Sequence, residues 1–342
     1  SIFSITIIAL YFFSVFAVFF TKFVNLRIGT VLAAGIAFIA FIVAAYRPEY
    51  FPDVDTYEVM YKFAKTGKFN DPAYWASHGE AGFKVLSYLL SLIGLKYSGF
   101  LLTIATMSYF LLMYISRLSS IPFSYLWFSY FSFYFITRDL GVIRVAIASH
   151  LIVIFFLQRK MIGRAVSITI ASVVFQYLAI LVVVVKPFTR IKINWGSVSL
   201  LFLFSFAMSD LITFENFSFL LPNNNYEGSR AAEKAGVSIM LPIARNIFFA
   251  SLLYLLMKNE IRFEYYRIWI WSAILSVSFY IMASGILIVA QRLSAYFGAV
   301  IPLAMAFVMH RQSTKMDSFL LVVFFCLLNF SFLLYFNSWV WQ

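Results

Sequence analysis

The chain has 342 residues, of which 63% are hydrophobic and only 12% are charged, and its mean hydropathy is +0.90. This apolar share lies far above that of a soluble domain. Several stretches of about 18 or more residues carry no charge, which is enough to cross about 30 Å of hydrocarbon. Apolar residues do not alternate every second position as in an outer-membrane barrel. The composition therefore predicts an all-α, polytopic membrane protein with about 10–12 transmembrane helices, in a single transmembrane domain over residues 1–342.

Several other classes of protein are excluded by composition. The net charge is +12, but the aromatic residues are not interleaved with basic ones, so nucleic-acid binding is not indicated. The only cysteine, Cys326, excludes an intramolecular disulfide, and we expect it to be a buried small hydrophobe. The three histidines lack metal-ligand spacing, so no metal site is expected. The chain has no P-loop, GxSxG or Rossmann glycine pattern, and no cofactor is expected.

In chain order, the apolar stretches predicted to form helices are 1–21, 28–46, 81–95, 98–116, 120–137, 139–157, 165–185, 196–213, 239–257, 268–291, 292–309 and 318–337. Two long polar loops interrupt this series, at about 47–80 and about 214–238. The stretch 81–95 is shorter than a full span and carries Lys84. It is therefore expected to be a short re-entrant or interfacial helix.

Basic residues gather in six short loops, which the positive-inside rule places in the cytoplasm: 22–27, 117, 159–164, 186–192, 258–267 and 311–315. With Asp317 at their edge, these loops hold 14 of the 26 basic and 3 of the 14 acidic residues, a net charge of +11 out of +12. The two long polar loops then lie outside. Simple alternation of spans contradicts this arrangement, and two departures resolve the conflict. The stretch 81–95 stays on the outer side, and the stretch 165–185 is broken near Phe175-Gln176-Tyr177 and returns to the cytoplasmic side.

The stretch Thr137–Ala148 places Arg138, Asp139 and Arg144 at the entrance of an apolar helix expected from about residue 139. A charge at membrane depth costs a few kcal/mol or more, so it is a functional hypothesis by default. For Arg138, which flanks the span, the alternative is snorkelling to the interface or an ion pair with Asp139. Arg144 is expected well inside the helix, where snorkelling is a weaker explanation.

Once the cytoplasmic loops are set aside, five arginines remain at the outer ends of helices: Arg47, Arg138, Arg144, Arg245 and Arg292. They would converge if the helices pack as a bundle. Arginine keeps its charge at physiological pH and binds phosphate through two hydrogen bonds. Such a cluster suits a lipid-linked phosphate or pyrophosphate. The alternative is pairing of these arginines with Asp139, Asp210 and other acids.

The outer loop 47–80 supplies carboxylates. Glu80 stands where this loop enters the short apolar helix, so it is a candidate to accept a proton from a sugar hydroxyl. The alternative for Glu80 is a favourable charge at a helix N-terminus. Asp55 with Glu58 three residues later resembles a capping box, and capping is the alternative for Asp53 and Asp55.

Four motifs resemble the Wzy/EpsG-like polysaccharide polymerases over about residues 45–300: Arg47 with Asp53-x-x-x-Tyr57-x-x-x-Tyr61, Glu80-x-Gly82-Phe83-x-x-Leu86, Ile143-Arg144-x-x-Ile147-Ala148, and Arg292-x-x-x-Tyr296-Phe297. The chain departs from the family pattern at three places. Val145 stands where the family usually has Gln, and Pro52 where it usually has Gly near the aspartate. Gln176 stands where the family often has histidine, and an amide cannot take a proton.

The resemblance implies an enzyme of the O-antigen or exopolysaccharide pathway in the bacterial inner membrane, similar in fold to lipid-phosphosugar (GT-C-like) glycosyltransferases. Its donor and acceptor would be undecaprenyl-pyrophosphate-linked oligosaccharides, joined at the periplasmic face. A hydroxyl of one repeat attacks the anomeric carbon of the growing chain, and undecaprenyl pyrophosphate leaves. A chain-length regulator protein is a candidate partner. No metal is required, because arginines can take its place.

Within this interpretation the candidate residues have separate roles. Arg144 and Arg292 would bind the pyrophosphate, with Arg138, Arg245 and Arg47 in support. Glu80 is the first choice for the base and Asp53 the second. The candidate sugar-binding residues are Tyr57, Trp75 and Tyr296.

Three other functions compete with polymerisation. A flippase or transporter of the same lipid-linked glycan would have polar groups near the midplane and often repeated halves, neither of which the sequence indicates. A ligase would use the same chemistry with a different acceptor. A membrane acyltransferase would more naturally use a histidine, but His150 lies in an apolar stretch where a packed, hydrogen-bonded role is expected.

Overall fold

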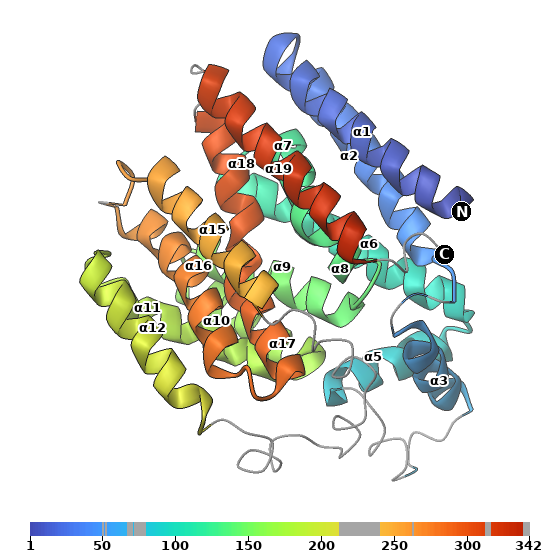
Figure 1. Ribbon diagram of the computed structural model, residues 1–342. Coiled ribbons are helices and arrows are strands. Elements are labelled where there is room, and N and C mark those ends of the chain that lie inside the picture. The colour runs from blue at the N-terminus through green and yellow to red at the C-terminus, as the bar shows by residue number, and fades with distance from the viewer. Residues whose placement is uncertain are drawn as a thin grey trace. The chain divides into compact units, whose positions relative to one another are not determined.

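The computed structural model describes residues 1–49, 51, 53–66, 71, 80–211, 240–261, 263–311 and 316–337. Helices are the only regular elements among these residues, as the sequence predicted (Figure 1). The chain divides into two compact units. The first comprises Ser1–Tyr177 with Pro302–Gln342, and the second comprises Leu178–Ile301.

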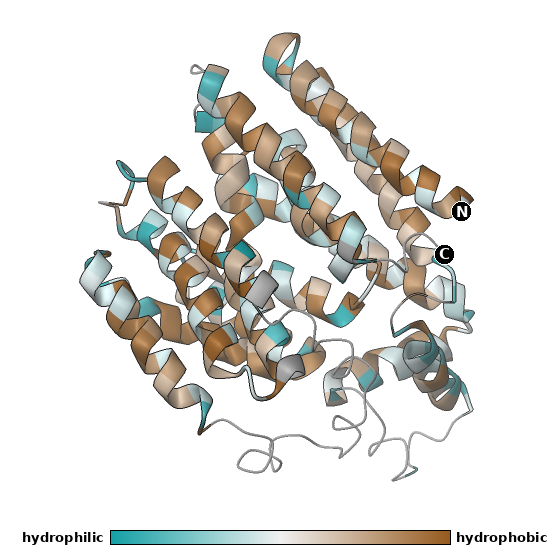
Figure 2. Ribbon diagram, viewed as in Figure 1, coloured by the Kyte–Doolittle hydropathy of each residue, from teal (hydrophilic) through white to brown (hydrophobic). Residues whose placement is uncertain are grey.

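Five helices in the described part are long and apolar enough to cross a membrane: Ile2–Phe23, Leu26–Ala45, Tyr97–Ser119, Val289–Arg311 and Met316–Tyr335. Six shorter apolar helices of 10–17 residues accompany them. Figure 2 shows hydrophobic residues along almost the whole length of the longer helices. These helices confirm an all-α polytopic membrane protein, whereas the expected total of about 10–12 spans stays a prediction.

The helices of the first unit are α1 (Ile2–Phe23), α2 (Leu26–Ala45), α3 (Val54–Lys65), α5 (Ala81–Leu92), α6 (Tyr97–Ser119), α7 (Phe123–Tyr130), η2 (Phe131–Phe135), α8 (Ile136–Arg138), α9 (Ile143–Leu157), α10 (Met161–Ile170), η3 (Ala171–Phe175), α18 (Ile301–Arg311) from its second residue, and α19 (Met316–Phe336). Helix α2 packs against α1, α6 and α7, and α6 packs against α9. The short helices α3 and α5 pack on each other, and α5 also contacts η3. Helix α9 is buried along nearly its whole length.

Polar side chains inside the first unit are paired across helices. The indole of Trp127 donates to Ser14, and Thr21 donates to Ser124, both at 2.8 Å. The amide of Asn329 on α19 donates to the carbonyl oxygen of Ser132 at 2.7 Å. Hydrocarbon offers no alternative partner to such groups, so these bonds tie α1, η2, α7 and α19 together. Cys326 is buried, as expected.

The helix in the stretch 165–185 is interrupted where the sequence predicted a break. A π-helix, η3, ends at Phe175, and Gln176 follows with extended backbone (φ −161°, ψ 110°). A 3₁₀-helix, η4 (Tyr177–Val184), then begins. Each change alters the backbone hydrogen-bonding pattern, so the chain cannot continue as one straight helix. The break is confirmed, and the return of the chain to the cytoplasmic side stays a prediction.

The helix predicted from about residue 139 begins later than expected, at Ile143. The residues from Asp139 to Val142 form a turn instead. A Cβ added at Gly141 would lie 2.4 Å from the carbonyl oxygen of Thr137, so only glycine fits this tight turn. The expectation that Arg144 lies well inside its helix is therefore wrong, because Arg144 stands in the first turn of α9.

The second unit contains most of η4, then α11 (Val185–Phe188), α12 (Trp195–Ser209), α15 (Met240–Leu256), α16 (Glu264–Met282), α17 (Leu287–Phe297) and η8 (Gly298–Val300). Helix α16 is its centre and packs against α11, α12, α15 and α17. The hydroxyl of Ser294 on α17 binds Ser276 of α16 at 2.9 Å and accepts from Asn246 of α15 at 2.8 Å. The second polar loop, 214–238, lies outside the described residues.

Candidate functional site

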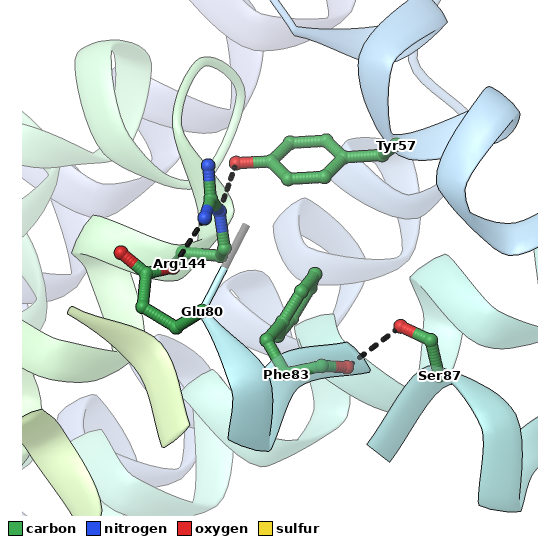
Figure 3. A network of polar contacts seen from close by, with 5 residues as sticks. All are labelled: Tyr57, Glu80, Phe83, Ser87 and Arg144. Atoms are coloured by element: carbon green, nitrogen blue, oxygen red, sulfur yellow. Dashed lines mark hydrogen bonds and ion pairs between the residues drawn. The ribbon is translucent and has the colours of Figure 1, made fainter. Parts of the chain in front are cut away.

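The first unit holds a buried ion pair between two of the predicted site residues. Nη1 of Arg144 binds Oε2 of Glu80 (Figure 3), and the side chains are 3% and 10% exposed. The pair joins α9 to the N-terminus of α5, and its two residues lie 64 positions apart in the chain. Glu80 is the N-cap residue of α5, as its sequence position indicated, but its side chain makes no capping hydrogen bond. The carboxylate faces the arginine instead.

Tyr57 on α3 connects two of the arginines. Its hydroxyl accepts from Nε of Arg144 at 3.5 Å, and Figure 3 shows the guanidinium between this hydroxyl and the carboxylate of Glu80. The Cζ atoms of Arg144 and Arg47 lie 5.6 and 6.0 Å from the centre of the Tyr57 ring, within the range of cation–π attraction. Burial raises the pKa of the Tyr57 phenol, although the charge of Arg144 opposes this. Tyr57 therefore stays neutral between the two cations.

Arg47 follows α2, as predicted, and is only 6% exposed. Its Nη1 donates to the carbonyl oxygen of Asp139 at 2.9 Å. Its Nε and Nη2 are buried and have no hydrogen-bond partner among the described residues. Burial lowers the pKa of the Arg47 guanidinium, but arginine keeps its charge in proteins. A buried cation that leaves two donors unused is expensive to maintain, which indicates a functional role.

A small cavity lies beside Arg47, with the size of about one water molecule. Its polar lining comes from Arg47, Ser108 and Asp139, and the rest is apolar: Ala44, Leu101, Ile104, Ala105, Ile143 and Ile147. Arg47, which has two unused donors, thus lines a cavity together with Ser108 and Asp139.

Hydroxyl groups hold the carboxylate of Asp139. Ser108 donates to its Oδ1 at 2.6 Å, and Tyr130 donates to its Oδ2. Ser108 also contacts Nε2 of His150 at 2.9 Å. Because the single hydroxyl hydrogen of Ser108 goes to Asp139, Nε2 of His150 must be the donor in this contact. The expected packed, hydrogen-bonded role of His150 is confirmed.

Arg138 ends α8 and contacts an aromatic ring. Its Cζ lies 3.3 Å from the centre of the Tyr134 ring, and its side chain is buried. Arg138 therefore does not snorkel to the surface of the unit, and it is stacked on an aromatic ring beside Asp139. Among the described residues, no group of three His, Cys, Asp or Glu side chains is placed to hold a metal ion.

Asp53 adds a negative charge to the cluster of buried charged residues formed by Arg47, Glu80, Arg138, Asp139 and Arg144. It is the N-cap residue of α3, with a left-handed backbone (φ 61°) and no side-chain capping bond, a conformation that aspartate tolerates better than most residues. Its carboxylate acts electrostatically on Arg47, Tyr57 and Arg144. The predicted capping box is wrong, because α3 begins at Val54, before Asp55, and Glu58 pairs with Lys62 at 2.9 Å.

Two of the five predicted arginines belong to the second unit. Arg245 lies on α15 and Arg292 on α17, and the hydrogen bond between Asn246 and Ser294 joins these helices. Arg292 is half-buried, and none of the described residues forms a hydrogen bond or ion pair with it. The convergence of Arg245 and Arg292 with Arg144 stays a prediction.

The predicted sugar-binding residues are Tyr57, Trp75 and Tyr296, and only Tyr57 has a described contact with the arginines of the first unit. Tyr296 is fully buried on α17 of the second unit. Trp75 lies outside the described residues. Tyr57 is buried between Arg47 and Arg144, as described above. The sugar-binding roles of all three stay predictions.

The family model for the EpsG family matches residues 30–341 of this chain. The chain belongs to the EpsG family. This is an exopolysaccharide and O-antigen polymerase-like family, so the match confirms the resemblance drawn from the four sequence motifs. No curated protein and no solved structure matches the chain.

Lys84 is a member of the cluster in this EpsG-family protein that the sequence interpretation did not assign. It lies on α5 one turn after Glu80 and is only 2% exposed. Arg144 and Glu80 both act on it electrostatically. From the sequence, Lys84 indicated only that the stretch 81–95 is not a full membrane span. The spacing of four residues from Glu80 was the available signal, because residues i and i+4 share one face of a helix.

Gly82 sets the position of α5 and therefore of Glu80. A Cβ added at Gly82 would lie 2.6 Å from Cα of Val174 and 2.9 Å from the carbonyl oxygen of Val173. These are backbone atoms of η3, which cannot move aside as a flexible side chain can. The adjacent Phe83 packs edge-on against Phe100, with ring centres 5.8 Å apart. Glycine at position 82 thus permits the close approach of α5 to η3.

We expect Gly82→Val to destabilise this EpsG-family protein by roughly 1–3 kcal/mol, because the added side chain overpacks the contact between α5 and η3. The measurement is thermal unfolding of the detergent-solubilised protein. Gly35→Val on α2 is the matched control, since an added Cβ there meets nothing within 4 Å. Equal melting temperatures for the two variants would contradict the close approach.

Proposed function

We propose that this EpsG-family protein is a glycosyltransferase that polymerises undecaprenyl-pyrophosphate-linked oligosaccharide repeats at the periplasmic face of the bacterial inner membrane. The polymerase-like role of the family supports the reaction class. The observation that carries the proposal is the buried guanidinium of Arg144, oriented by Glu80 and Tyr57. A membrane protein keeps such a charge at a cost, and phosphate is the ligand that its donors suit best.

The charge of the cluster favours an anionic ligand. Its cations outnumber its carboxylates by four to three: Arg47, Lys84, Arg138 and Arg144 against Asp53, Glu80 and Asp139. Arg144 also stands in the first turn of α9, where the helix dipole is positive. When the bond between sugar and pyrophosphate breaks, negative charge develops on the leaving pyrophosphate. Cations already held in a dry environment stabilise that charge without reorganising.

The remaining parts of the reaction fall to other residues in this proposal. Glu80 accepts the proton of the attacking hydroxyl, and Asp53 is the second candidate for this role. Arg292 and Arg245 of the second unit add to the pyrophosphate site. Tyr57, Trp75 and Tyr296 are the candidates for contact with the sugars, and a chain-length regulator protein is a candidate partner.

Incubation of the purified protein with lipid-linked repeat units tests the proposal. A ladder of products that differ by one repeat is the expected result. Transport of unchanged substrate across a vesicle would instead identify a flippase, which is the main alternative. Transfer of a single glycan to a different acceptor, with no ladder, would identify a ligase.

We expect Arg292→Ala to abolish the ladder and Arg292→Lys to restore little of it, because lysine cannot bind phosphate in a bidentate way. Arg292 has no structural partner among the described residues, so both variants should reach the membrane at normal levels. The measurements are the product ladder and the amount of membrane-inserted protein. A full ladder from Arg292→Ala would remove Arg292 from the pyrophosphate site.

A further inference from the structure

We propose that the lipid-linked pyrophosphate displaces Glu80 from Arg144 when it binds, and that this exchange releases the base that the reaction requires. The inference rests on the proposed function. It adds to that function an order of events at one ion pair: first exchange of anions on Arg144, then proton transfer to Glu80.

Glu80 and a pyrophosphate compete for the same donors. Nη1 of Arg144 is bound to Oε2 of Glu80, and Nε is bound to the hydroxyl of Tyr57 at 3.5 Å. A guanidinium binds carboxylate and phosphate oxygens through the same N–H groups. In the proposed exchange an incoming phosphate oxygen takes the place of the carboxylate at Nη1, while the bond to Tyr57 remains.

Arg144 is the partner that stays in place. Its side chain is 3% exposed and starts from a helix that is buried along nearly its whole length. Its Cζ lies 5.6 Å from the ring centre of Tyr57 and 5.7 Å from that of Phe83. These two rings and the Tyr57 hydroxyl fix the guanidinium, so the anion site exists before the ligand arrives.

Glu80 is the partner that moves. Its side chain is more exposed than that of Arg144, at 10%, and makes no capping bond to the amides of α5. Its backbone is anchored separately, because its carbonyl oxygen accepts from the amide of Lys84 at 3.1 Å. The carboxylate can therefore rotate away from Arg144 without unwinding α5, and Figure 3 shows it reaching the guanidinium from the helix end.

The resting ion pair also explains how the site is stable without a ligand. A buried arginine that lacks a partner is strongly destabilising. Glu80 supplies that partner until the pyrophosphate does. The same residue is thus a placeholder in the free protein and a base in the complex.

Release from Arg144 changes the chemistry of the carboxylate, because a carboxylate beside a cation resists protonation. Once released, Glu80 accepts the proton of the attacking hydroxyl. The hydroxyl oxygen forms a bond to the anomeric carbon of the donor. The bond from that carbon to the pyrophosphate oxygen breaks, and its electron pair leaves with undecaprenyl pyrophosphate. Donor binding therefore prepares the base that the acceptor needs.

The test compares affinity with turnover in the full-length purified protein, with undecaprenyl pyrophosphate in detergent as the binding probe. We expect Glu80→Gln to bind the probe roughly tenfold more tightly, since the competing anion is gone. Polymer turnover by the same variant should fall by about 10²–10⁴-fold, since the base is gone. Tighter binding together with slower turnover distinguishes the exchange from a Glu80 that is only structural or that acts only as the general base.

Glu58→Gln is the matched control, because it removes a carboxylate from the exposed pair with Lys62 on the adjacent helix α3. It should alter neither affinity nor turnover. In an Arg144→Ala background, Glu80→Gln should no longer change the affinity, because the anion site is absent. Glu80→Asp, which keeps the charge, should bind the probe no more tightly than the wild type.

Unchanged or weaker probe binding by folded Glu80→Gln would overturn the exchange, whatever the wild type synthesises. Tighter binding together with no ladder from the wild type would support the exchange and overturn the polymerase proposal. The two failures are therefore distinguishable, because probe binding is measured without polymerisation.

Discussion

Arg144→Ala should abolish detectable polymer while the protein still inserts into the membrane. The guanidinium is the central group of the site, since it contacts Glu80, Tyr57 and the ring of Phe83. Loss of one donor to a developing negative charge typically costs 10²–10³-fold in rate, and Arg144 would supply at least two. We expect Arg144→Lys to recover little activity, because an ammonium cannot reproduce the planar arrangement of donors.

Two variants separate catalysis from folding at this position. Arg144→Ala leaves Glu80 largely buried without its cation, so some loss of thermal stability is expected. Adding Glu80→Gln should recover the stability and not the polymer. Arg27→Ala is the control, because Arg27 is also the second residue of an apolar helix, α2, but is exposed. A normal ladder from Arg144→Ala would defeat the proposed anion site.

Arg47→Met should lower the activity without lowering the thermal stability. Arg47 buries Nε and Nη2 without hydrogen-bond partners, and each such donor costs about 1–3 kcal/mol. Methionine keeps the apolar stem and removes both donors, at the loss of the bond to the carbonyl oxygen of Asp139. We therefore expect unchanged or higher thermal stability together with a fall in polymer synthesis of about 10²-fold.

The melting temperature and the initial rate of polymer synthesis are measured on the same preparation of Arg47→Met. Ser278→Ala on α16 is a control for removal of a buried, unpartnered polar atom, because its hydroxyl also lacks a partner among the described residues. It should match or exceed the stability of the wild type with full activity. A less stable but fully active Arg47→Met would mean that Arg47 is a structural residue.

Much of the fold follows from local patterns that the sequence displays directly. Charge-free runs of sufficient length predicted the long helices, since only hydrophobicity and length decide whether a helix can span a membrane. The break at Phe175-Gln176-Tyr177 followed from the charges of the flanking loops. Glu80 was placed at a helix N-terminus because a polar loop meets an apolar run there.

Other local expectations failed because competing local contacts override them. The apolar pattern extends toward residue 139, but the turn at Gly141 delays α9 until Ile143, since the backbone is too close there for any side chain. Asp55 and Glu58 have the spacing of a capping box, but Glu58 pairs with Lys62 instead. Both competing contacts join residues only four positions apart, so a spacing pattern alone does not tell which local contact forms.

The stretch Thr137–Ala148 shows the same division at the candidate site. The sequence alone determined that Arg138, Asp139 and Arg144 are charges in or beside an apolar helix and need partners, because a bilayer does not solvate them. Only the tertiary structure decided which partners these are. Arg138 stacks on Tyr134, Asp139 accepts from Ser108 and Tyr130, and Arg144 binds Glu80. Arg138 thus finds its ring four residues away, whereas Ser108 and Glu80 reach Asp139 and Arg144 only because helix packing brings α6 and α5 to these residues.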